Sequence, residues 1–310
     1  MTARLNSVVR KKIMRARVRQ YNHAADYERV SRFLVRTYCT TGVHINWLQP
    51  RWEFMHYHPL IRGVDLDSIG VWEAHGEVVG VVHPEHDMGT AYFEIAPEYG
   101  ALKGEMLRHA EENMSTPRDG VRRLSVLIND EDDDFRKLAS EMGYLKGDSR
   151  DPMSDFLIPA PFPAVPLPPG FRLKSLAEDN DLRKVTRVLW RGFDHGDEPP
   201  GDAIEDRNFM QSAPNYRRGL NIVVAAPDGN FVSYCGMWYE PVHSIAYVEP
   251  VATDPEYRRM GLGRAAVLEG IRRCGEMGAT VAWVGSTKPF YLSLGFRLAY
   301  RSSFWQREWT

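Results

Sequence analysis

Hydrophobic and polar residues follow two similar series along the chain. Residues 17–36 begin with a short alternating stretch and continue with apolar residues every three or four positions, and residues 172–191 repeat this pattern at a constant offset. Alternation predicts a strand, and the wider spacing predicts an amphipathic helix. In the second series, an apolar run at 246–252 precedes a glycine-rich turn and a helical pattern from Arg264 to about Met277. These patterns predict strands and helices that alternate twice.

Both series contain further signals in the same order. Each has a hairpin pattern with glycine in its turn, and each ends with a helix that runs into glycine and an aromatic residue. In chain order, these turns and helix ends are His75-Gly76, Gly143-Tyr144, Asp228-Gly229 and Gly295-Phe296. A duplicated α/β unit is the economical explanation.

A proline-rich segment at residues 159–170 separates the two copies. Proline at alternate positions excludes a helix and disfavours a central strand, which leaves an extended connector. We therefore expect an N-terminal extension at 1–14, a first domain at 15–158, the connector, and a second domain at 171–310.

Composition is typical of a globular protein and excludes some partners. The 310 residues suffice for two domains, and 43% hydrophobic with 26% charged residues is the usual balance of a soluble protein. With 39 basic and 41 acidic residues the net charge is −2, which provides no field for nucleic acid or an anionic membrane. No apolar run approaches the roughly 18–20 residues that span a bilayer. We therefore expect neither a nucleic-acid nor a membrane partner.

Three cysteines and a basic N-terminus give information on the cellular compartment. Cys39, Cys235 and Cys274 are widely separated and odd in number, which favours a reducing, cytoplasmic location and no metal site. Residues 1–19 are rich in Arg and Lys, but no long apolar segment follows, so they do not form a secretory signal. A short lead-in before the first strand is the expected structure, with an Arg-rich transit segment as the alternative.

Residues 258–263, Arg-Arg-Met-Gly-Leu-Gly, carry the clearest chemistry. A turn between a strand and a helix directs several backbone N–H groups to one spot, where the positive end of the helix dipole adds to them. Gly261 and Gly263 matter because a Cβ would block close approach of a ligand or a positive φ. The turn therefore predicts a site for a phosphate or pyrophosphate group.

The second half resembles the GNAT N-acetyltransferase superfamily. The matching residues are 249–257, Glu-Pro-Val-Ala-Thr-Asp-Pro-Glu-Tyr, followed by Arg258-x-x-Gly261-x-Gly263. About 30 residues later, residues 289–296, Pro-Phe-Tyr-Leu-Ser-Leu-Gly-Phe, are similar to the family's Phe-Tyr-x-x-x-Gly-Phe signature. The likeness covers residues 170–310 well and 15–155 weakly. The chain thus resembles a tandem GNAT protein whose first copy is degenerate.

The resemblance implies an α/β (α+β) fold of two GNAT-like domains, each a mixed, mostly antiparallel sheet flanked by helices. In this family acetyl-CoA lies as co-substrate between two splayed strands. Backbone groups of Val251 and Thr253 would pair with its pantetheine arm, and amides from Met260 to Arg264 would hold its pyrophosphate. By position, the expected cofactor-binding residues are Val251, Ala252, Thr253, Arg258, Arg259, Met260, Gly261, Leu262, Gly263, Arg264 and Ser286. For Arg258 the alternative is a structural surface cation.

Tyr291 and Glu249 are the expected catalytic residues. The resemblance assigns Tyr291 as general acid, since a phenol with a pKa near ~10 can protonate a leaving thiolate. Glu249 is the candidate base that removes a proton from the amine. A packed aromatic and a strand-ordering carboxylate are the respective structural alternatives. His195, Glu240 and His243 are weaker candidates. The loop after the fifth strand is short, and the alternatives are that Ser286 replaces the asparagine of many relatives or that this cofactor contact is absent.

The first copy departs from the family pattern. Residues 99–105 lack the basic start and the close glycine pair, and residues 135–138, Phe-Arg-Lys-Leu, contain no phenol. The acidic run at 130–134 would repel a polyphosphate. We expect one acetyl-CoA site per chain, in the second half.

The expected activity is transfer of acetyl from acetyl-CoA to a primary amine of a small molecule, by direct attack in a ternary complex. The acidic loop at 192–200 would suit a cationic amine. Alternatives are a protein or peptide N-acetyltransferase, a mycothiol-synthase-like enzyme, and a non-catalytic acyl-CoA-binding regulatory module. Neither the acceptor nor the oligomeric state follows from the sequence.

Overall fold

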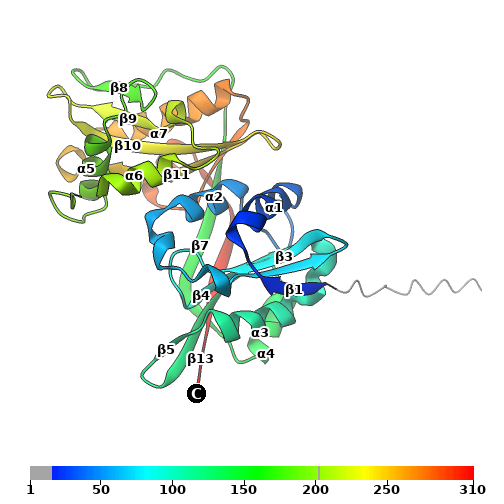
Figure 1. The fold of residues 1–310 in the computed structure, drawn as a ribbon. Helices are drawn as coiled ribbons and strands as arrows, with labels where there is room; N and C mark the ends of the chain where they lie inside the picture. Colours follow the sequence, from blue (N-terminus) through cyan, green and yellow to red (C-terminus); the bar gives the residue numbers. More distant parts are fainter. Residues whose placement is uncertain (1–15, 202) are drawn as a thin grey trace, which may run out of the picture.

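One sheet of 13 strands runs through both halves of the chain in the computed structural model, which describes residues 16–201 and 203–310. The order is β1-β2-β3-β4-β6-β13-β7-β12-β11-β10-β9-β8, with β5 beside β6. Figure 1 shows two lobes, each with helices against its part of the sheet, and two long strands that run between them. The expected extension at 1–14 lies outside the described residues.

The first half supplies the following elements: β1 (Arg17–Gln20), α1 (His23–Arg36), α2 (Gln49–Tyr57), η1 (Pro59–Gly63), η2 (Leu66–Ser68), β2 (Gly70–Ala74), β3 (Glu77–His83), β4 (Thr90–Ile95), η3 (Pro97–Leu102), α3 (Lys103–Asn113), β5 (Thr116–Arg118), β6 (Val121–Asn129), α4 (Asp133–Glu141) and β7 (Leu145–Leu157).

The second half supplies a matching set: β8 (Arg172–Ser175), α5 (Leu182–Gly192), α6 (Ala203–Gln211), η4 (Arg218–Leu220), β9 (Ile222–Ala225), β10 (Phe231–Glu240), β11 (Ile245–Thr253), η5 (Pro255–Tyr257), α7 (Leu262–Glu276), β12 (Val281–Val284), α8 (Pro289–Leu294) and β13 (Arg297–Trp309).

Local sequence explains why these elements begin where they do. Helix α1 starts after Asn22, whose side chain accepts from the N–H of Ala25, and α5 starts after Asp181, whose side chain accepts from two helix N–H groups. The first hairpin turns at His75-Gly76, where both residues have a positive φ. The strand, helix and hairpin patterns of the two series are therefore confirmed, and α7 begins two residues earlier than expected.

The two halves exchange their long strands. β7 leaves the first half and pairs antiparallel with β12, from Leu157 opposite Val281 to Ser154 opposite Val284. β13 returns from the second half and pairs antiparallel with β6, from Ser302 opposite Asn129 to Trp309 opposite Arg122. Strand pairing therefore joins the segments before and after residues 159–170, and the division into two domains there stays a prediction.

A shared apolar core also joins the halves. Each half has its own buried cluster, and a third cluster combines Leu48, Phe54 and Met153 of the first half with Met210, Trp238, Tyr247 and Trp283 of the second. Burial of this surface stabilises the contact between the halves. The contact positions first-half side chains against β10 and β11.

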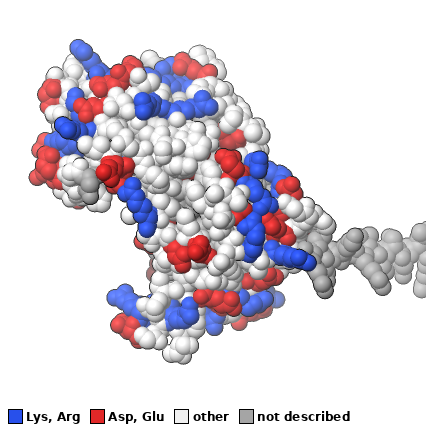
Figure 2. Space-filling model, viewed as in Figure 1, with Lys and Arg blue, Asp and Glu red and all other residues white. Residues whose placement is uncertain are grey.

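The surface carries both signs of charge. Figure 2 shows basic and acidic side chains interspersed over the visible face, without a continuous region of one sign. Among the described residues, no helix has the length and apolar character that crossing a membrane requires.

Candidate active site

Strands β11 and β12 separate and open a gap in the sheet. They pair in parallel only from Ile245 opposite Val281 to Tyr247 opposite Trp283, after which β11 continues to Thr253 and β12 ends. On its other edge β11 is paired with β10, and the N–H of Asp254 donates to Val232. Because hydrogen bonding alternates along an antiparallel strand, the backbone groups of Val251 and Thr253 face the gap.

A bulge in β11 marks the start of the gap. The register with β10 shifts between Cys235 and Met237, so that Gly236 lies against Glu249 and Pro250. A Cβ on Gly236 would come within 2.5 Å of the carbonyl oxygen of Glu249. Only glycine therefore fits here. Sequence analysis missed this residue, although an isolated glycine within a strand pattern is a signal for a bulge.

The glycine turn has the geometry of an anion site. Arg259 and Gly261 have φ values of 63° and 82°, and Gly261 precedes the first residue of α7. A Cβ on Gly263 would lie 2.9 Å from Thr253 Oγ1, so glycine allows the helix to approach β11 closely. The first N–H groups of α7 have no intrahelical acceptor and point out of the helix end. The turn can therefore present several N–H donors to one phosphate group.

A cavity of about 390 Å³ lies over this turn. Of the expected cofactor residues, its wall contains Thr253, Arg258, Arg259, Gly261, Leu262, Gly263 and Arg264. Tyr257, together with Phe290 and Ser293 of α8, completes the wall, whereas Val251, Ala252, Met260 and Ser286 are not part of it. Ser286 follows β12, where its Oγ accepts from the N–H of Lys288 at 3.2 Å and its carbonyl accepts from Ser154 Oγ at 2.8 Å.

Two arginines of the turn hold the local structure. Arg258 Nη2 donates to the carbonyl of Gly192 and to Asp194, each at 2.9 Å. Arg264 Nη1 donates to the carbonyl of Ser293 at 3.1 Å. These contacts favour the structural interpretation of Arg258 and leave the backbone amides as the main anion donors.

Glu249 has the chemistry of a base. Burial raises the pKa of its carboxyl to about 7, with a further increase from the negative charge of Glu85, while Arg51 and Lys288 oppose the increase. Its backbone carbonyl accepts from Trp238 Nε1 at 3.0 Å, which holds the bulge. A carboxyl with a pKa near the working pH can accept a proton and release it again.

Tyr291 has the chemistry of an acid. Burial raises the pKa of its phenol, and the negative charge of Glu249 raises it further, so the hydroxyl keeps its proton at neutral pH. The ring lies between Phe290 and Phe296, at centroid distances of 4.9 and 5.8 Å. Tyr291 is thus a packed aromatic whose hydroxyl lies in the electrostatic field of Glu249.

A larger cavity of about 650 Å³ lies between the halves, with Glu249 and Pro250 in its wall. Helix α5 contributes Thr186, Leu189, Trp190 and Phe193, and helix α6 contributes Ala203, Asp206, Arg207 and Met210. Both sets follow the spacing of one helix face. The first half contributes Phe54, His58, Pro59, Leu60 and His86. We call this space the acceptor cavity.

The three weaker catalytic candidates lie in different parts of the structure. His195 lies in the wall of the acceptor cavity, with its ring 5.0 Å from that of Trp190. Glu240 instead accepts from the N–H of Val242 and from His243 Nδ1, the latter at 2.8 Å, and so closes the turn between β10 and β11. Glu240 and His243 are therefore structural.

The acidic loop at 192–200 is neutralised by arginines. Within the described part of the chain, its carboxylates pair as Asp194–Arg258, Asp197–Arg191 and Glu198–Arg187, at 2.9, 2.5 and 4.0 Å. The expectation that this loop attracts a cationic amine is weakened, because paired carboxylates contribute little net field.

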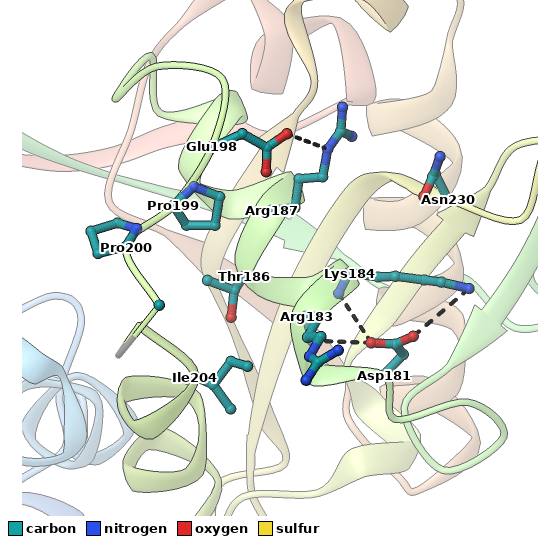
Figure 3. A pocket seen from close by; sticks show the side chains of 11 residues that line it. Asp181, Arg183, Lys184, Thr186, Arg187, Glu198, Pro199, Pro200, Ile204 and Asn230 are labelled. Atoms are coloured by element: carbon teal, nitrogen blue, oxygen red, sulfur yellow. Dashed lines mark hydrogen bonds and ion pairs between the residues drawn. The ribbon is translucent and has the colours of Figure 1, made fainter.

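Figure 3 shows another hollow, on the outer side of α5. Lys184 pairs with Asp181 and Arg187 with Glu198, and neither Glu249 nor the glycine turn contributes to its wall. The candidate site therefore consists of the two cavities described above. Among the described residues, no group of three or more His, Cys, Asp or Glu is arranged to hold a metal ion.

In the first half, the corresponding gap is filled by the chain itself. The Asn46 side chain accepts from the N–H of Ile95 at 2.8 Å and donates to its carbonyl at 3.2 Å, and His44 Nε2 contacts the carbonyl of Phe93 at 2.9 Å. At the start of α3, Lys103 is ion-paired with Asp132. These contacts occupy the strand edge and helix end that a second acetyl-CoA would need.

Comparisons with known proteins bear on the family and the fold. Residues 182–296 match the model of the acetyltransferase (GNAT) family. Mycothiol acetyltransferase from Thermomonospora curvata is 29% identical over 155 residues, which are 47% of this chain and 50% of that protein. The match therefore spans about half the length of this relative.

Two solved structures share the fold of nearly the whole chain. A GCN5-related N-acetyltransferase from Sphaerobacter thermophilus has a TM-score of 0.64 at 15% identity, over 94% of this chain and 95% of that one. A tandem GNAT protein from the clavulanic acid biosynthesis pathway has a TM-score of 0.63 at 15% identity, over 95% and 98% of the two chains. The fold is thus a tandem GNAT fold, as expected. Within that fold, the part of the chain that matches the acetyltransferase (GNAT) family model is the second half, at residues 182–296.

Proposed function

We propose that the chain transfers the acetyl group of acetyl-CoA to a primary amine of a small molecule, in a ternary complex. The observation that carries the proposal is the position of Glu249. This carboxyl, with a pKa of about 7, lies on the bulge of β11, between the glycine turn and the acceptor cavity. The cavity volume of about 650 Å³ is in the range of small-molecule sites.

The proposed reaction gives each residue one task. The amides of the glycine turn bind the pyrophosphate, and the backbone of Val251 and Thr253 pairs with the pantetheine arm. Glu249 takes a proton from the ammonium group of the acceptor, and the amine then attacks the thioester carbonyl. A backbone N–H near Val251 stabilises the oxyanion. When the C–S bond breaks, the Tyr291 hydroxyl gives its proton to the thiolate, and the excess proton on the attacking nitrogen restores the Tyr291 phenol. The products are an amide, CoA and the proton that Glu249 accepted.

Substitution of Tyr291 by Phe tests the catalytic role against mere packing. The variant keeps the ring between Phe290 and Phe296 and loses only the hydroxyl. We expect unchanged acetyl-CoA affinity and a fall of about tenfold or more in amine-dependent CoA release. Equal activity of the variant and the parent would assign Tyr291 to packing alone. No CoA release by an intact, cofactor-binding parent across a broad amine panel would favour the non-catalytic acyl-CoA-binding module.

A second candidate is a mycothiol-synthase-like reaction. It is supported by the 29% identity with mycothiol acetyltransferase over about half of that protein. An assay with the acceptor that mycothiol acetyltransferase uses tests this second candidate directly. Preference for this acceptor over simple amines would support the candidate, and a peptide acceptor series would test protein acetylation in the same format.

A further inference from the structure

The acceptor cavity contains a cation that has no ionic partner among the described residues. Arg207 lies on the face of α6 that lines the cavity, and it forms no ion pair with any residue in 16–201 or 203–310. Its neighbour Asp206 is already paired, with Arg62 Nη1 at 2.6 Å. The guanidinium of Arg207 therefore keeps its full charge for a ligand.

Several polar atoms in the same wall also lack partners. Among the described residues, the buried side-chain atoms without a hydrogen bond include His86 Nε2, Thr186 Oγ1, Trp190 Nε1 and Arg207 Nε, all in residues that line this cavity. Buried polar groups are nearly always paired in a functional state, by protein, water or ligand. This wall is therefore rich in unmet hydrogen-bonding capacity, mainly from donors.

Two histidines in the wall, His58 and His86, carry no charge that would repel an ammonium group. Burial lowers the pKa of His58 to about 3, helped by His86 and Arg207, and burial also lowers the pKa of His86. Both rings are neutral at pH 7 and lie 4.6 Å apart. Phe54, Trp190 and Phe193 add aromatic rings to the wall, and Leu60, Leu189 and Met210 add aliphatic side chains.

We infer that the acceptor is a primary amine that also carries a carboxylate, held by Arg207 across an apolar or aromatic skeleton. The inference rests on the proposed function and names its substrate class. Glu249, as carboxylate, receives the ammonium group on one wall, and Arg207 binds the carboxylate on another. Arginine suits this task because its planar fork can form two parallel hydrogen bonds to a carboxylate.

Matched acceptor pairs test the inference. Phenylalanine and phenethylamine differ by a carboxylate next to the amine, and 4-(aminomethyl)benzoate and benzylamine differ by a distant one. We expect the parent to prefer a carboxylate-bearing member in kcat/KM. In Arg207→Gln this preference should fall by about 10- to 100-fold, the range for loss of a hydrogen bond to a charged group. Arg207→Lys should retain part of it.

Arg183→Gln is the control variant, because Arg183 is exposed on α5 and does not line the acceptor cavity. It makes the same change of charge and should leave the preference intact. Equal use of both members of each pair by the parent would overturn the inference. A parallel loss with charged and neutral acceptors in Arg207→Gln would also overturn it, since that result indicates a structural role.

A binding measurement separates this inference from the proposed function. 3-Phenylpropionate lacks the amine, so it can bind but cannot react. We expect it to quench tryptophan fluorescence in the parent and to bind at least tenfold more weakly to Arg207→Gln. Binding with no turnover of any amine would contradict the proposed function and leave the carboxylate site supported. Equal affinity for both proteins would refute the carboxylate site.

Discussion

Arg51 holds Glu85 through two parallel hydrogen bonds of 2.9 Å, from Nε and Nη2 to the two carboxylate oxygens. Arg51 also donates to Asp151 at 2.8 Å and lies over the ring of Trp47 at 4.1 Å. All four residues belong to the first half, yet the charges of Arg51 and Glu85 both act on the pKa of Glu249. The degenerate copy therefore contributes to the electrostatics of the candidate base.

Glu85→Gln should lower the pKa of Glu249. The negative charge of Glu85 raises that pKa, whereas Arg51, which stays in place through Asp151, lowers it. We expect the acidic limb of the kcat/KM profile to move to lower pH. Glu77→Gln is the control, because Glu77 is exposed and paired with Arg36 on the surface. An acidic limb that does not move would show that the first half has no electrostatic influence on the reaction.

Activity should fall as the pH drops through about 7, because Glu249 must be ionised to accept a proton. Glu249→Gln should remove this acidic limb of the pH–activity profile and lower kcat by about 10²- to 10⁴-fold, the usual contribution of a positioned base. The readout is CoA release between pH 5.5 and 9 under saturating acetyl-CoA. A variant with the parent's pH profile would place the base elsewhere.

Glu249→Gln should also stabilise the folded protein at alkaline pH. The folded pKa of Glu249 is raised, so ionisation favours the unfolded chain, whose carboxyl titrates near 4.5. The parent loses stability as pH rises from about 4.5 to about 7, and the loss is complete above pH 7. We expect Glu249→Gln to gain up to about 3 kcal/mol at pH 8 and little at pH 4. Urea unfolding at both pH values measures this difference, and an equal effect at both would contradict it.

Gly236→Ala should damage the site through the backbone. The added Cβ would lie 2.5 Å from the carbonyl oxygen of Glu249, where no flexible side-chain end can move aside. We expect a loss of about 1–3 kcal/mol in the free energy of unfolding and a loss of activity. Gly219→Ala is the control, since nothing lies within 4 Å of its Cβ position. Parent-like stability and activity of Gly236→Ala would refute the importance of this close approach.

Acetyl-CoA should bind with a stoichiometry of one per chain. Asn46 and Lys103 occupy the first-half gap and helix end, whereas the second-half turn is free of such contacts within residues 16–201 and 203–310. Calorimetric titration should give one site, and Gly263→Val should abolish it, because even a Cβ there would lie 2.9 Å from Thr253 Oγ1. Residual binding in this variant would reveal a second site.

Local sequence was enough to predict the helices, the strands and the glycine turn. Periodicity predicted the paired strand and helix patterns, Asn22 and Asp181 begin helices as caps do, and Gly261 takes the positive φ that its place before α7 requires. These features depend on residues within one or two turns of each other, so the pattern of residue types carries them. The order of the motifs then indicated a tandem GNAT fold, and the two solved structures compared above have this fold.

Only the tertiary structure decided how the halves combine. Nothing local indicated that β7 would pair with β12 and β13 with β6, because strand pairing depends on segments more than a hundred residues apart. The raised pKa of Glu249 likewise comes from burial and from Glu85, 164 positions earlier in the sequence numbering. The sequence by itself determined which residues could bind a phosphate or move a proton. The packing of one half against the other determined the cavity, the charge around Glu249 and the place of Arg207 in the cavity wall, since burial and Coulomb interactions depend on distance in space.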